Sequence, residues 1–323
     1  MLPARYLSVA PMMEYTDRHD RYFLRLISKH TWLYTEMLTT NSLIHGDAER
    51  FLQYNASEHP LALQLGGSDP KDLASCCEMA NQFGYDEVNL NVGCPSDRVK
   101  SGRFGASLMA EPMLVARCVE AMQVKSNAPV TVKCRLGIDD QDEYDDLKNF
   151  IKIVSAGGCK IFIIHARKAW LQGLSPKENR DIPPLNYSIV HRIKEEFPQL
   201  EVIINGGFKT IEQSKLQLAS IDGVMIGREA YHNPYILAQA DREIYGDERT
   251  IPSRKEILQQ FLPYIEDQLS SGLALTAISR HILGLFQGLP GAKAWRRYIS
   301  ENAHKKGAGV NVVEKALTFV TEE

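Results

Sequence analysis

Apolar residues occur in eight short runs through residue 229, and most runs are followed by a segment with helical or polar character. The runs cover residues 5–12, 32–37, 61–67, 87–95, 130–137, 159–167, 201–207 and 222–229. Most are nearly continuous apolar stretches, a pattern typical of parallel strands covered on both faces. Eight strand–helix units predict an α/β fold, the (β/α)8 barrel. An open doubly wound sheet is the alternative, but no GxGxxG follows its first strand, which argues against it.

The pattern changes after Pro252 and Ser253, where strand-like runs end and helical spacing takes over. Four segments have this spacing, and glycine or Pro-Gly positions separate them; they cover residues 256–269, 275–289, 293–305 and 312–320. Because glycine and proline interrupt helices, the spacing predicts a C-terminal all-α helical bundle. We expect a barrel domain over residues 1–245 and a helical domain over residues 246–323.

Composition narrows the classes of function that remain. The 323 residues carry a formal net charge of −3, so RNA binding would depend on a local basic patch. None of the six cysteines forms a CxxC pair and no dense Cys/His cluster occurs, so we expect reduced thiols and no metal. The sequence has no secretory segment and no apolar run of membrane length. These features predict a soluble, cytoplasmic protein.

Candidate site residues lie where the predicted strands end, because the site of a (β/α)8 barrel is built at the C-terminal ends of its strands. Seven of the predicted strands end in such residues: Pro11-Met12-Met13, Gln64, Asn91 and Cys94, Lys133 and Arg135, His165 and Arg167, Asn205-Gly206-Gly207, and Gly227-Arg228. The last two groups predict a phosphate site, because glycine permits close backbone approach and arginine binds phosphate. Ordinary turn glycines are the alternative.

Three of these residues allow two interpretations each. Lys133 is either a surface lysine or a fixed cation beside a developing negative charge. His165 is either a hydrogen-bonded residue at a strand end or a ligand contact. Gln64 either satisfies a loop backbone or binds the edge of a heterocycle with its amide. The polar loop that follows His165 favours a ligand contact there.

Cys94 differs from the other cysteines because it lies between a glycine and a proline on a polar loop. The other five are expected to be small buried hydrophobic residues. Sequence indicates no catalytic dyad near Cys94, so proton donation is at least as well supported as covalent attack. The segment from Ser96 to Gly105, rich in glycine, arginine and lysine, is a candidate mobile lid that orders when RNA binds.

Several long motifs resemble those of the tRNA-dihydrouridine synthases: APMMEYTDRHDRYF, LALQLGGSDP, NLNVGCPSDRV, FIIHARKAW, LSPKENR, NGG and DGVMIGREA. The runs NVGCPSDRV and HARKAWLQGLSPKENRDIPPL are most similar to the A subfamily. The resemblance covers essentially the whole chain. It implies an FMN-containing barrel with a helical RNA-binding domain, which reduces the C5–C6 bond of selected uridines in the tRNA D-loop with NADPH.

The resemblance also implies roles for individual residues. The catalytic cysteine, which gives a proton to uracil C5 after hydride reaches C6, is Cys94. The implied FMN contacts are Pro11, Met12, Met13, Gln64, Lys133, His165, Asn205, Gly206, Gly207, Gly227 and Arg228. The implied tRNA contacts are Asn91, Lys177, Arg180, Lys293 and Arg296. Met13-Glu14-Tyr15 departs modestly from the Leu-Asp-Trp expected there, which affects no catalytic position. We expect a monomer.

Other interpretations remain open on sequence alone. One alternative is a flavin barrel that acts on a free pyrimidine, of the dihydropyrimidine or dihydroorotate dehydrogenase type. The basic helical tail argues against it, because a free pyrimidine would not need such a tail. Another alternative is an RNA-binding or RNA-folding module with a vestigial flavin site. The intact strand-end residues argue against it. The basic residues of the tail are either an RNA-binding patch or a solvated charged face. Trp295, Tyr298 and His304 are either core or stacking residues.

Overall fold

A computed structural model describes residues 4–96, 102–141 and 144–321. Eight parallel strands form its centre: β1 (Leu7–Val9), β2 (Leu33–Thr39), β3 (Leu61–Gly66), β4 (Glu87–Val92), β5 (Val130–Arg135), β6 (Ile161–His165), β7 (Glu201–Asn205) and β8 (Gly223–Ile226). Their order is β1-β8-β7-β6-β5-β4-β3-β2. A parallel bridge between Ser8 and Trp32 brings β1 next to the start of β2. The sheet therefore curls into a nearly closed barrel, which confirms the predicted fold and excludes the open sheet.

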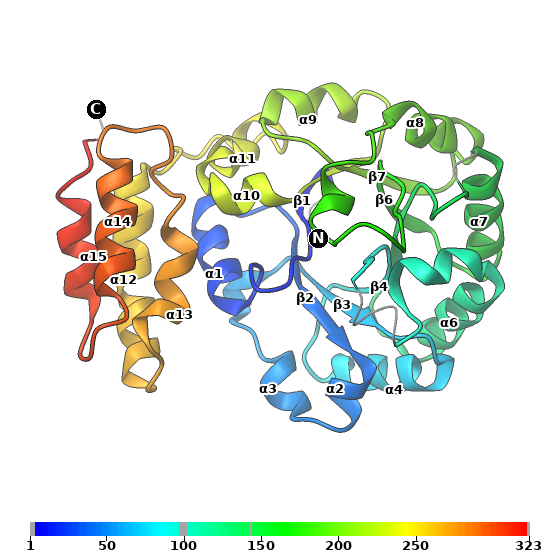
Figure 1. The fold of residues 1–323 in the computed structure, drawn as a ribbon, viewed down its shortest axis with the longest axis horizontal. Coiled ribbons are helices and arrows are strands. Elements are labelled where there is room, and N and C mark those ends of the chain that lie inside the picture. The colour runs from blue at the N-terminus through cyan, green and yellow to red at the C-terminus, as the bar shows by residue number, and fades with distance from the viewer. Residues whose placement is uncertain (1–3, 97–101, 142–143, 322–323) are drawn as a thin grey trace.

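Helices surround the strands as a ring, and Figure 1 shows this arrangement with the remaining helices gathered beside α1. The helices of the barrel are α1 (Arg18–Ile27), α2 (Thr40–Ile44), α3 (Ala48–Leu52), α4 (Pro70–Asn81), α6 (Pro112–Lys125), α7 (Tyr144–Ala156), α8 (Tyr187–Glu196), α9 (Ile211–Leu218), α10 (Arg228–His232) and α11 (Ala240–Glu243). Short 3-10 turns also occur, η1 (Ala56–Glu58), η2 (Gly105–Ala110), η3 (Glu178–Arg180) and η4 (Pro234–Gln239).

Side-chain caps explain where several of the barrel helices begin. Asp17 accepts hydrogen bonds from the backbone N–H groups of His19 and Asp20, at 2.9 and 3.1 Å. Asp69 caps α4 in the same way and Thr210 caps α9. Each cap satisfies backbone donors that the first helical turn leaves without partners.

Both faces of the strands are buried, as expected for a parallel sheet. The larger apolar cluster fills the space between the strands and the surrounding helices. A smaller cluster, which includes Trp32, Tyr34, Ile163, Ile203 and Met225, lies on the opposite face, inside the barrel. Because these apolar residues come mainly from β6, β7, β8 and the start of β2, the other inward positions are left for polar side chains.

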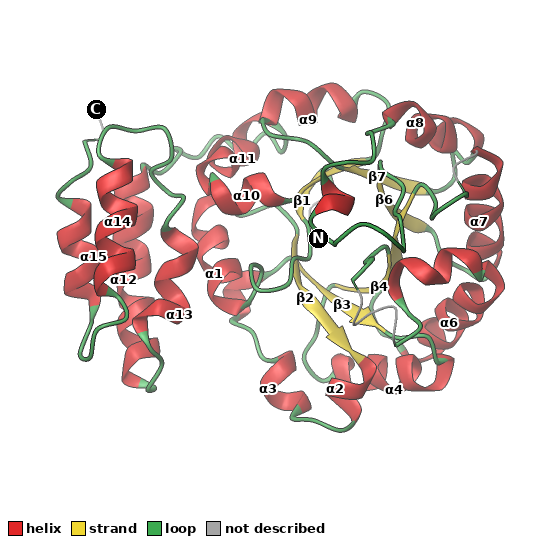
Figure 2. Cartoon of the chain, in the orientation of Figure 1, coloured by secondary structure: helices red, strands yellow, loops and turns green. Residues whose placement is uncertain are grey.

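The C-terminal segment is all-helical (Figure 2), with α12 (Arg254–Ser270), α13 (Leu275–Ser279), η5 (Arg280–Ile282), α14 (Ala292–Asn302) and α15 (Val310–Leu317). It packs on α1, where Tyr22 stacks on Tyr264 with ring centroids 4.0 Å apart. The larger apolar cluster continues from the barrel into these helices. This segment therefore shares a core with the barrel, and the division between residues 245 and 246 stays a prediction.

The structure corrects one expectation for the helical segment and decides between two interpretations of Trp295. The single helix expected over 275–289 is divided into α13, η5 and turns. A Cβ at Gly284 would lie 2.4 Å from the carbonyl oxygen of His232, so the two backbones approach closely there. Trp295 is fully buried, and its indole N–H donates to the carbonyl of Ile282 at 3.3 Å. Trp295 is therefore a core residue rather than an exposed stacking residue.

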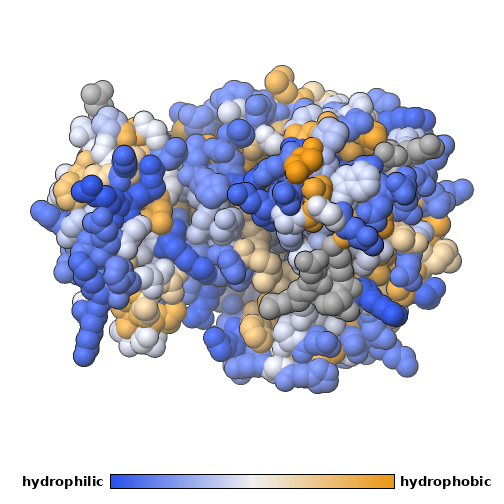
Figure 3. All heavy atoms as spheres, in the orientation of Figure 1, coloured by the Kyte–Doolittle hydropathy of each residue, from blue (hydrophilic) through white to orange (hydrophobic). Residues whose placement is uncertain are grey.

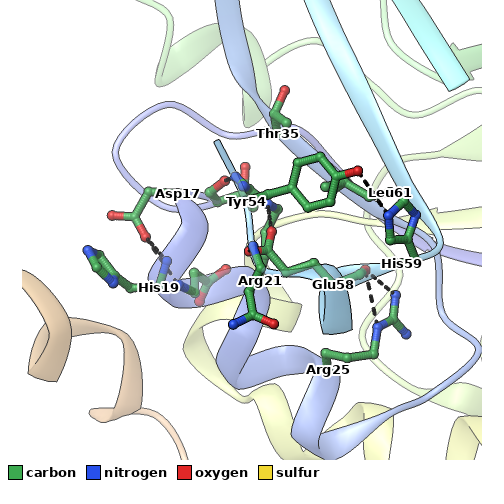
Figure 4. Close-up of polar contacts among 12 residues, drawn as sticks. Asp17, His19, Arg21, Arg25, Thr35, Tyr54, Glu58, His59 and Leu61 are labelled. Carbon is green, nitrogen blue, oxygen red and sulfur yellow. Dashed lines mark hydrogen bonds and ion pairs between the residues drawn. The ribbon is translucent and has the colours of Figure 1, made fainter. Parts of the chain in front are cut away.

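Buried arginines fix α1 against the chain that leads into β3, as Figure 4 shows. The Arg21 side chain pairs with Glu58 at 2.6 Å. Arg25 donates to the carbonyl oxygens of Glu58 and Thr31, at 3.0 and 2.8 Å. Charge-assisted hydrogen bonds of this kind satisfy backbone groups that are shielded from water. They hold the base of the loop that follows β1 in one position.

None of the helices in the described part of the chain combines the length and the apolar character needed to cross a membrane. Hydrophilic side chains cover most of the face drawn in Figure 3, on the barrel and on the helical segment alike.

Candidate active site

A cavity of about 700 Å³ opens at the C-terminal ends of the barrel strands. That volume is within the range of small-molecule and cofactor sites. Every residue that the resemblance assigned to FMN contributes to its lining, together with Cys94, Asn91 and Arg180. Lys177, Lys293 and Arg296 do not line it. The fold therefore brings together residues from strands far apart in the sequence at one site.

A chain of buried hydrogen bonds runs through the barrel to this cavity. Thr131 donates to Glu87 at 2.6 Å and accepts from Asn89 at 2.7 Å. Gln64 donates to Asn89 and accepts from Asn91, both at 2.8 Å. Each amide is held in one orientation because its neighbours fix which atom donates. Sequence analysis missed this chain, although the period-2 spacing of Glu87, Asn89 and Asn91 is a signal for it.

Asn91 ends this chain by capping the loop that carries Cys94. Its side-chain oxygen accepts from the backbone N–H groups of Gly93 and Cys94, at 3.1 and 3.0 Å. Its amide nitrogen makes one hydrogen bond, to Gln64, among the described residues, so one N–H remains for a ligand. The Cys94 thiol is partly exposed and donates to the Ser96 hydroxyl at 3.5 Å. The other five cysteines are buried, as predicted.

Lys133 lines the cavity from the end of β5. Its ammonium group donates to the side-chain oxygen of Asn205 at 3.1 Å, and Asn205 in turn donates to the carbonyl of Met225 at 2.8 Å. Desolvation, assisted by the neighbouring Arg135 charge, lowers the pKa of Lys133 to about 8. The interpretation of Lys133 as a surface lysine is therefore wrong. An anion beside the ammonium would stabilise its charged form.

His165 is a neutral imidazole in this environment. Desolvation and the positive charges of Arg135 and Lys133 hold its pKa well below the usual value. A neutral imidazole can donate from one ring nitrogen and accept at the other. His165 lies in the cavity wall, and its contact with a ligand stays a prediction.

Arg135 is a site residue to which the resemblance gave no role. Its guanidinium donates to the carbonyl of Gly93 at 2.8 Å and to those of Lys168 and Asn179, both at 3.0 Å. The side chain is buried, and desolvation lowers its pKa to about 10. One cation thus joins the Cys94 loop to the loop after β6. The only feature of the sequence that indicated Arg135 as a site residue was its position at the end of a predicted strand.

The backbone after β7 lines the cavity in conformations that favour glycine. Gly206 and Gly207 have φ angles of +126° and +77°. A Cβ at Gly206 would meet Leu185 at 2.7 Å and His165 at 3.0 Å. Both positions therefore require glycine. Nearby, the Arg228 side chain is partly exposed and pairs with Asp181 at 2.6 Å.

The remaining predicted RNA contacts lie outside the cavity. Lys177 is exposed at the start of η3, next to the cavity residue Pro176. Lys293 is exposed on α14, and Arg296 on the same helix donates to Gln287 at 2.8 Å. The predicted lid over residues 96–105 includes residues 97–101, which lie outside the described residues.

One group of side chains in the described part of the chain has the spacing of a metal site: His30, Asp241 and Asp247. The Arg249 guanidinium pairs with both carboxylates, and the imidazole of His30 pairs with Asp247 at 2.8 Å. These contacts account for the cluster without a metal ion.

The fold and this cavity define a (β/α)8-barrel protein with a cation-rich site at its strand ends, and comparison with known proteins gives its family. The family model described as Dihydrouridine synthase (Dus) matches residues 8–321. The chain therefore belongs to the dihydrouridine synthase family of flavin oxidoreductases.

Individual relatives agree along nearly the whole chain. A tRNA-dihydrouridine(20/20a) synthase of Vibrio cholerae is 61% identical over 315 residues, covering 97% of this chain and 96% of that protein. The protein of the same name in Vibrio parahaemolyticus is 59% identical over 318 residues, covering 98% of this chain and 97% of its own length. In Escherichia coli K12 the identity is 59% over 317 residues, with 98% and 92% covered.

A solved structure of a 2-naphthoyl-CoA reductase complex has the same fold. Its TM-score is 0.56 at 11% sequence identity, and the match covers 72% of this chain and 49% of that chain. At this identity the likeness shows the barrel architecture alone.

Proposed function

We propose that this protein reduces the C5–C6 double bond of D-loop uridines in tRNA to 5,6-dihydrouridine, with bound FMN as cofactor and NADPH as reductant. The observation that carries the proposal is the meeting of Cys94, Lys133 and the Gly206–Gly207 backbone in one cavity. Family membership and the names of the relatives support it. Cys94 is the catalytic residue in this proposal.

The residues present fit FMN. Gly206 and Gly207 line the cavity with positive φ angles that glycine adopts readily. Gly227 has open space around it, and Arg228 beside it supplies a guanidinium suited to a phosphate. Lys133 supplies a second positive charge deeper in the cavity. We therefore assign the phosphate to the Gly206–Gly207 and Gly227–Arg228 end, and the ring system to the Lys133 side.

In this scheme bound FMN, reduced by NADPH, supplies the hydride for uracil C6. The Cys94 S–H supplies the proton for C5, so that one uridine, one NADPH and one proton give one dihydrouridine and one NADP⁺. Asn91 keeps the Cys94 loop in place and offers its free amide N–H to the uracil edge. Lys133 remains protonated beside the anionic cofactor.

A tRNA substrate meets local positive charge despite the net charge of −3. Arg167 and Arg180 line the cavity, with Lys177 next to them. Lys293 and Arg296 lie on one helix, three residues apart. The target base has to leave the RNA fold to reach Cys94, as in other enzymes that modify bases. We assign the four residues Lys177, Arg180, Lys293 and Arg296 to the tRNA backbone, while the monomeric state and the cytoplasmic location stay predictions.

The experiment that tests the proposal maps dihydrouridine in tRNA lacking the modification, after incubation with FMN, NADPH and the protein. We expect product at D-loop positions with the wild type. Cys94→Ala should bind FMN and oxidise NADPH but form little dihydrouridine, while the matched control Cys76→Ala should remain active. Wild-type product from Cys94→Ala would disprove the role of the thiol. Reduction of free uracil or orotate without tRNA would favour a free-pyrimidine reductase, and a protein that binds no FMN would favour an RNA-binding module.

A further inference from the structure

Tyr15 forms part of an aromatic stack at the edge of the cavity. Its ring lies parallel to that of Tyr231 on α10, with centroids 4.1 Å apart and an angle of 9° between the planes. The His232 ring meets Tyr15 edge-on at 5.9 Å. Tyr15 and His232 also line the cavity, whereas Tyr231 does not. Tyr231 covers one face of the Tyr15 ring, while Tyr15 as a whole stays partly exposed.

The backbone holds this ring in a fixed position. The N–H groups of Tyr15 and Thr16 both donate to the carbonyl of Met12, at 3.1 and 3.0 Å. Glu14 adopts a left-handed φ of +66°, which a non-glycine residue rarely does. Its N–H donates to the carboxylate of Glu36. A costly conformation kept by several hydrogen bonds is a feature of ligand-contacting segments.

The stack lies between the cavity and the helical segment. The Tyr231 hydroxyl donates to the carbonyl of Arg280 in η5 at 3.4 Å, and the Arg280 side chain pairs with Asp17 at 2.5 Å. Figure 1 shows α1 between the barrel and helices α12–α15. An RNA strand that reaches from the cavity to α14 therefore passes this edge.

Tyr15 and Cys94 belong to different sides of the cavity. Tyr15 follows β1 and Cys94 follows β4, and β2 and β3 stand between these strands in the barrel. A uracil within reach of the Cys94 thiol is therefore separate from a group resting on Tyr15. The same edge carries the carboxylates of Glu14 and Glu229, which repel phosphate. An uncharged flat group fits Tyr15 better than the RNA backbone does.

We propose that Tyr15 is a stacking platform for a nucleobase adjacent to the reacting uridine in the RNA substrate. The inference rests on the proposed function. When a uridine leaves the RNA stack, a neighbouring base loses its partner, and an aromatic ring can replace that partner without regard to base identity. Tyr15, backed by Tyr231, supplies such a ring where the strand leaves the cavity.

The first test compares Tyr15→Leu and Tyr15→Phe with the wild type in steady-state turnover of unmodified tRNA. Loss of one base–aromatic stack is expected to raise KM for tRNA about tenfold in Tyr15→Leu. Tyr15→Phe should retain most of the affinity because it keeps the ring. Both variants should keep the FMN content and the rate of flavin reduction by NADPH. Tyr6→Leu, which changes an exposed tyrosine before β1, is the control and should leave all values unchanged.

The second test uses tRNA in which the nucleotide before or after the target uridine is abasic. For one of these two substrates the KM of the wild type should rise about tenfold, as it does for Tyr15→Leu on intact tRNA. The KM of Tyr15→Leu should be the same for that substrate as for intact tRNA. If Tyr15→Leu is unstable, the KM values of the wild type for intact and abasic tRNA still test the inference. Equal KM values for wild type and Tyr15→Leu on intact tRNA, or slower flavin reduction with an unchanged KM, would overturn the inference while leaving the proposed function in place. A wild type that forms no dihydrouridine would overturn both.

Discussion

The side-chain oxygen of Asn91 accepts a hydrogen bond from the backbone N–H of Cys94 at 3.0 Å. Asn91 is itself held by Gln64 on the neighbouring strand, at 2.8 Å. The position of the thiol thus depends on buried amides of β3 and β4 rather than on its loop alone. A rigid framework behind a reactive group preserves the geometry that a proton transfer requires.

Substitution of Asn91 should separate its two roles. Asn91→Ala removes the oxygen that caps the Cys94 loop, and we expect dihydrouridine formation to fall about 10- to 100-fold because the thiol is misplaced. Asn91→Asp keeps an oxygen acceptor but loses the N–H offered to the uracil. The rate of Cys94 alkylation by iodoacetamide should therefore rise in Asn91→Ala and stay near the wild-type rate in Asn91→Asp, whose KM for tRNA should rise instead. Identical alkylation rates in all three proteins would contradict the capping role, and Asn127→Ala on the surface is the control.

The sequence predicts the barrel well because its strands are marked twice, by apolar runs and by the residues that end them. Cys94, Lys133 and His165 were identified as site residues for this second reason. The contacts of Arg135 could not be predicted, because its three carbonyl partners lie on loops that only the closed barrel brings together. For the same reason the stack of Tyr15 on Tyr231 has no local signal, since the two residues are 216 positions apart in the sequence and only the fold makes them neighbours.

The ionisation of Lys133 predicts how FMN affinity depends on pH. The pKa of Lys133 is about 8 in the protein without ligand, and a flavin ring that accepts a hydrogen bond from its ammonium group would raise that pKa. Binding therefore takes up a proton above pH 8, and the affinity should be flat below pH 8 and fall about tenfold per unit above it. Quenching of FMN fluorescence, titrated from about pH 6 to about pH 10, measures this.

Two variants complete the test of Lys133. Lys133→Met should bind FMN more weakly and lose the fall in affinity above pH 8, because no ammonium remains to be deprotonated. Lys160→Met, at an exposed position before β6, should keep the wild-type profile. A Lys133→Met profile that still falls above pH 8 would mean that another group controls binding.

Charge reversal on α14 should weaken tRNA binding without affecting the cofactor. Lys293→Glu removes one phosphate contact in our proposal, so we expect about tenfold weaker binding and a salt slope smaller by about 1. Arg180→Ala, at the cavity edge, should act in the same direction. Filter binding at several salt concentrations, with FMN content from absorbance, measures both effects. Lys152→Glu on the outer helix α7 is the matched control; if it weakens binding as much as Lys293→Glu does, the effect is one of net charge and the patch is refuted.

A buried carboxylate at the junction of α1 and η5 should limit stability near neutral pH. Asp20 is almost fully buried, and one of its oxygens has no hydrogen-bond partner among the described residues. The nearest ring nitrogen of His281 is 3.7 Å from its other oxygen. Burial, reinforced by the negative charge of Asp17, holds the pKa of Asp20 well above the usual value. Other charged groups that act on this carboxyl are Arg21, Glu36 and Arg280.

Asp20→Asn should therefore stabilise the protein at neutral pH. The folded state keeps a proton on Asp20 that the unfolded chain releases above its ordinary pKa of 3.8. The free energy of unfolding thus falls by up to about 1.4 kcal/mol per pH unit between that value and the raised one. The amide cannot ionise, so Asp20→Asn should remove this fall and gain at least about 1 kcal/mol at pH 7, with little difference below about pH 4. Urea unfolding at a series of pH values measures the gain, and Asp145→Asn at an exposed position on α7 should change stability by less than about 0.5 kcal/mol. A loss of stability in Asp20→Asn at pH 7 would instead mean that Asp20 is ionised in the folded protein.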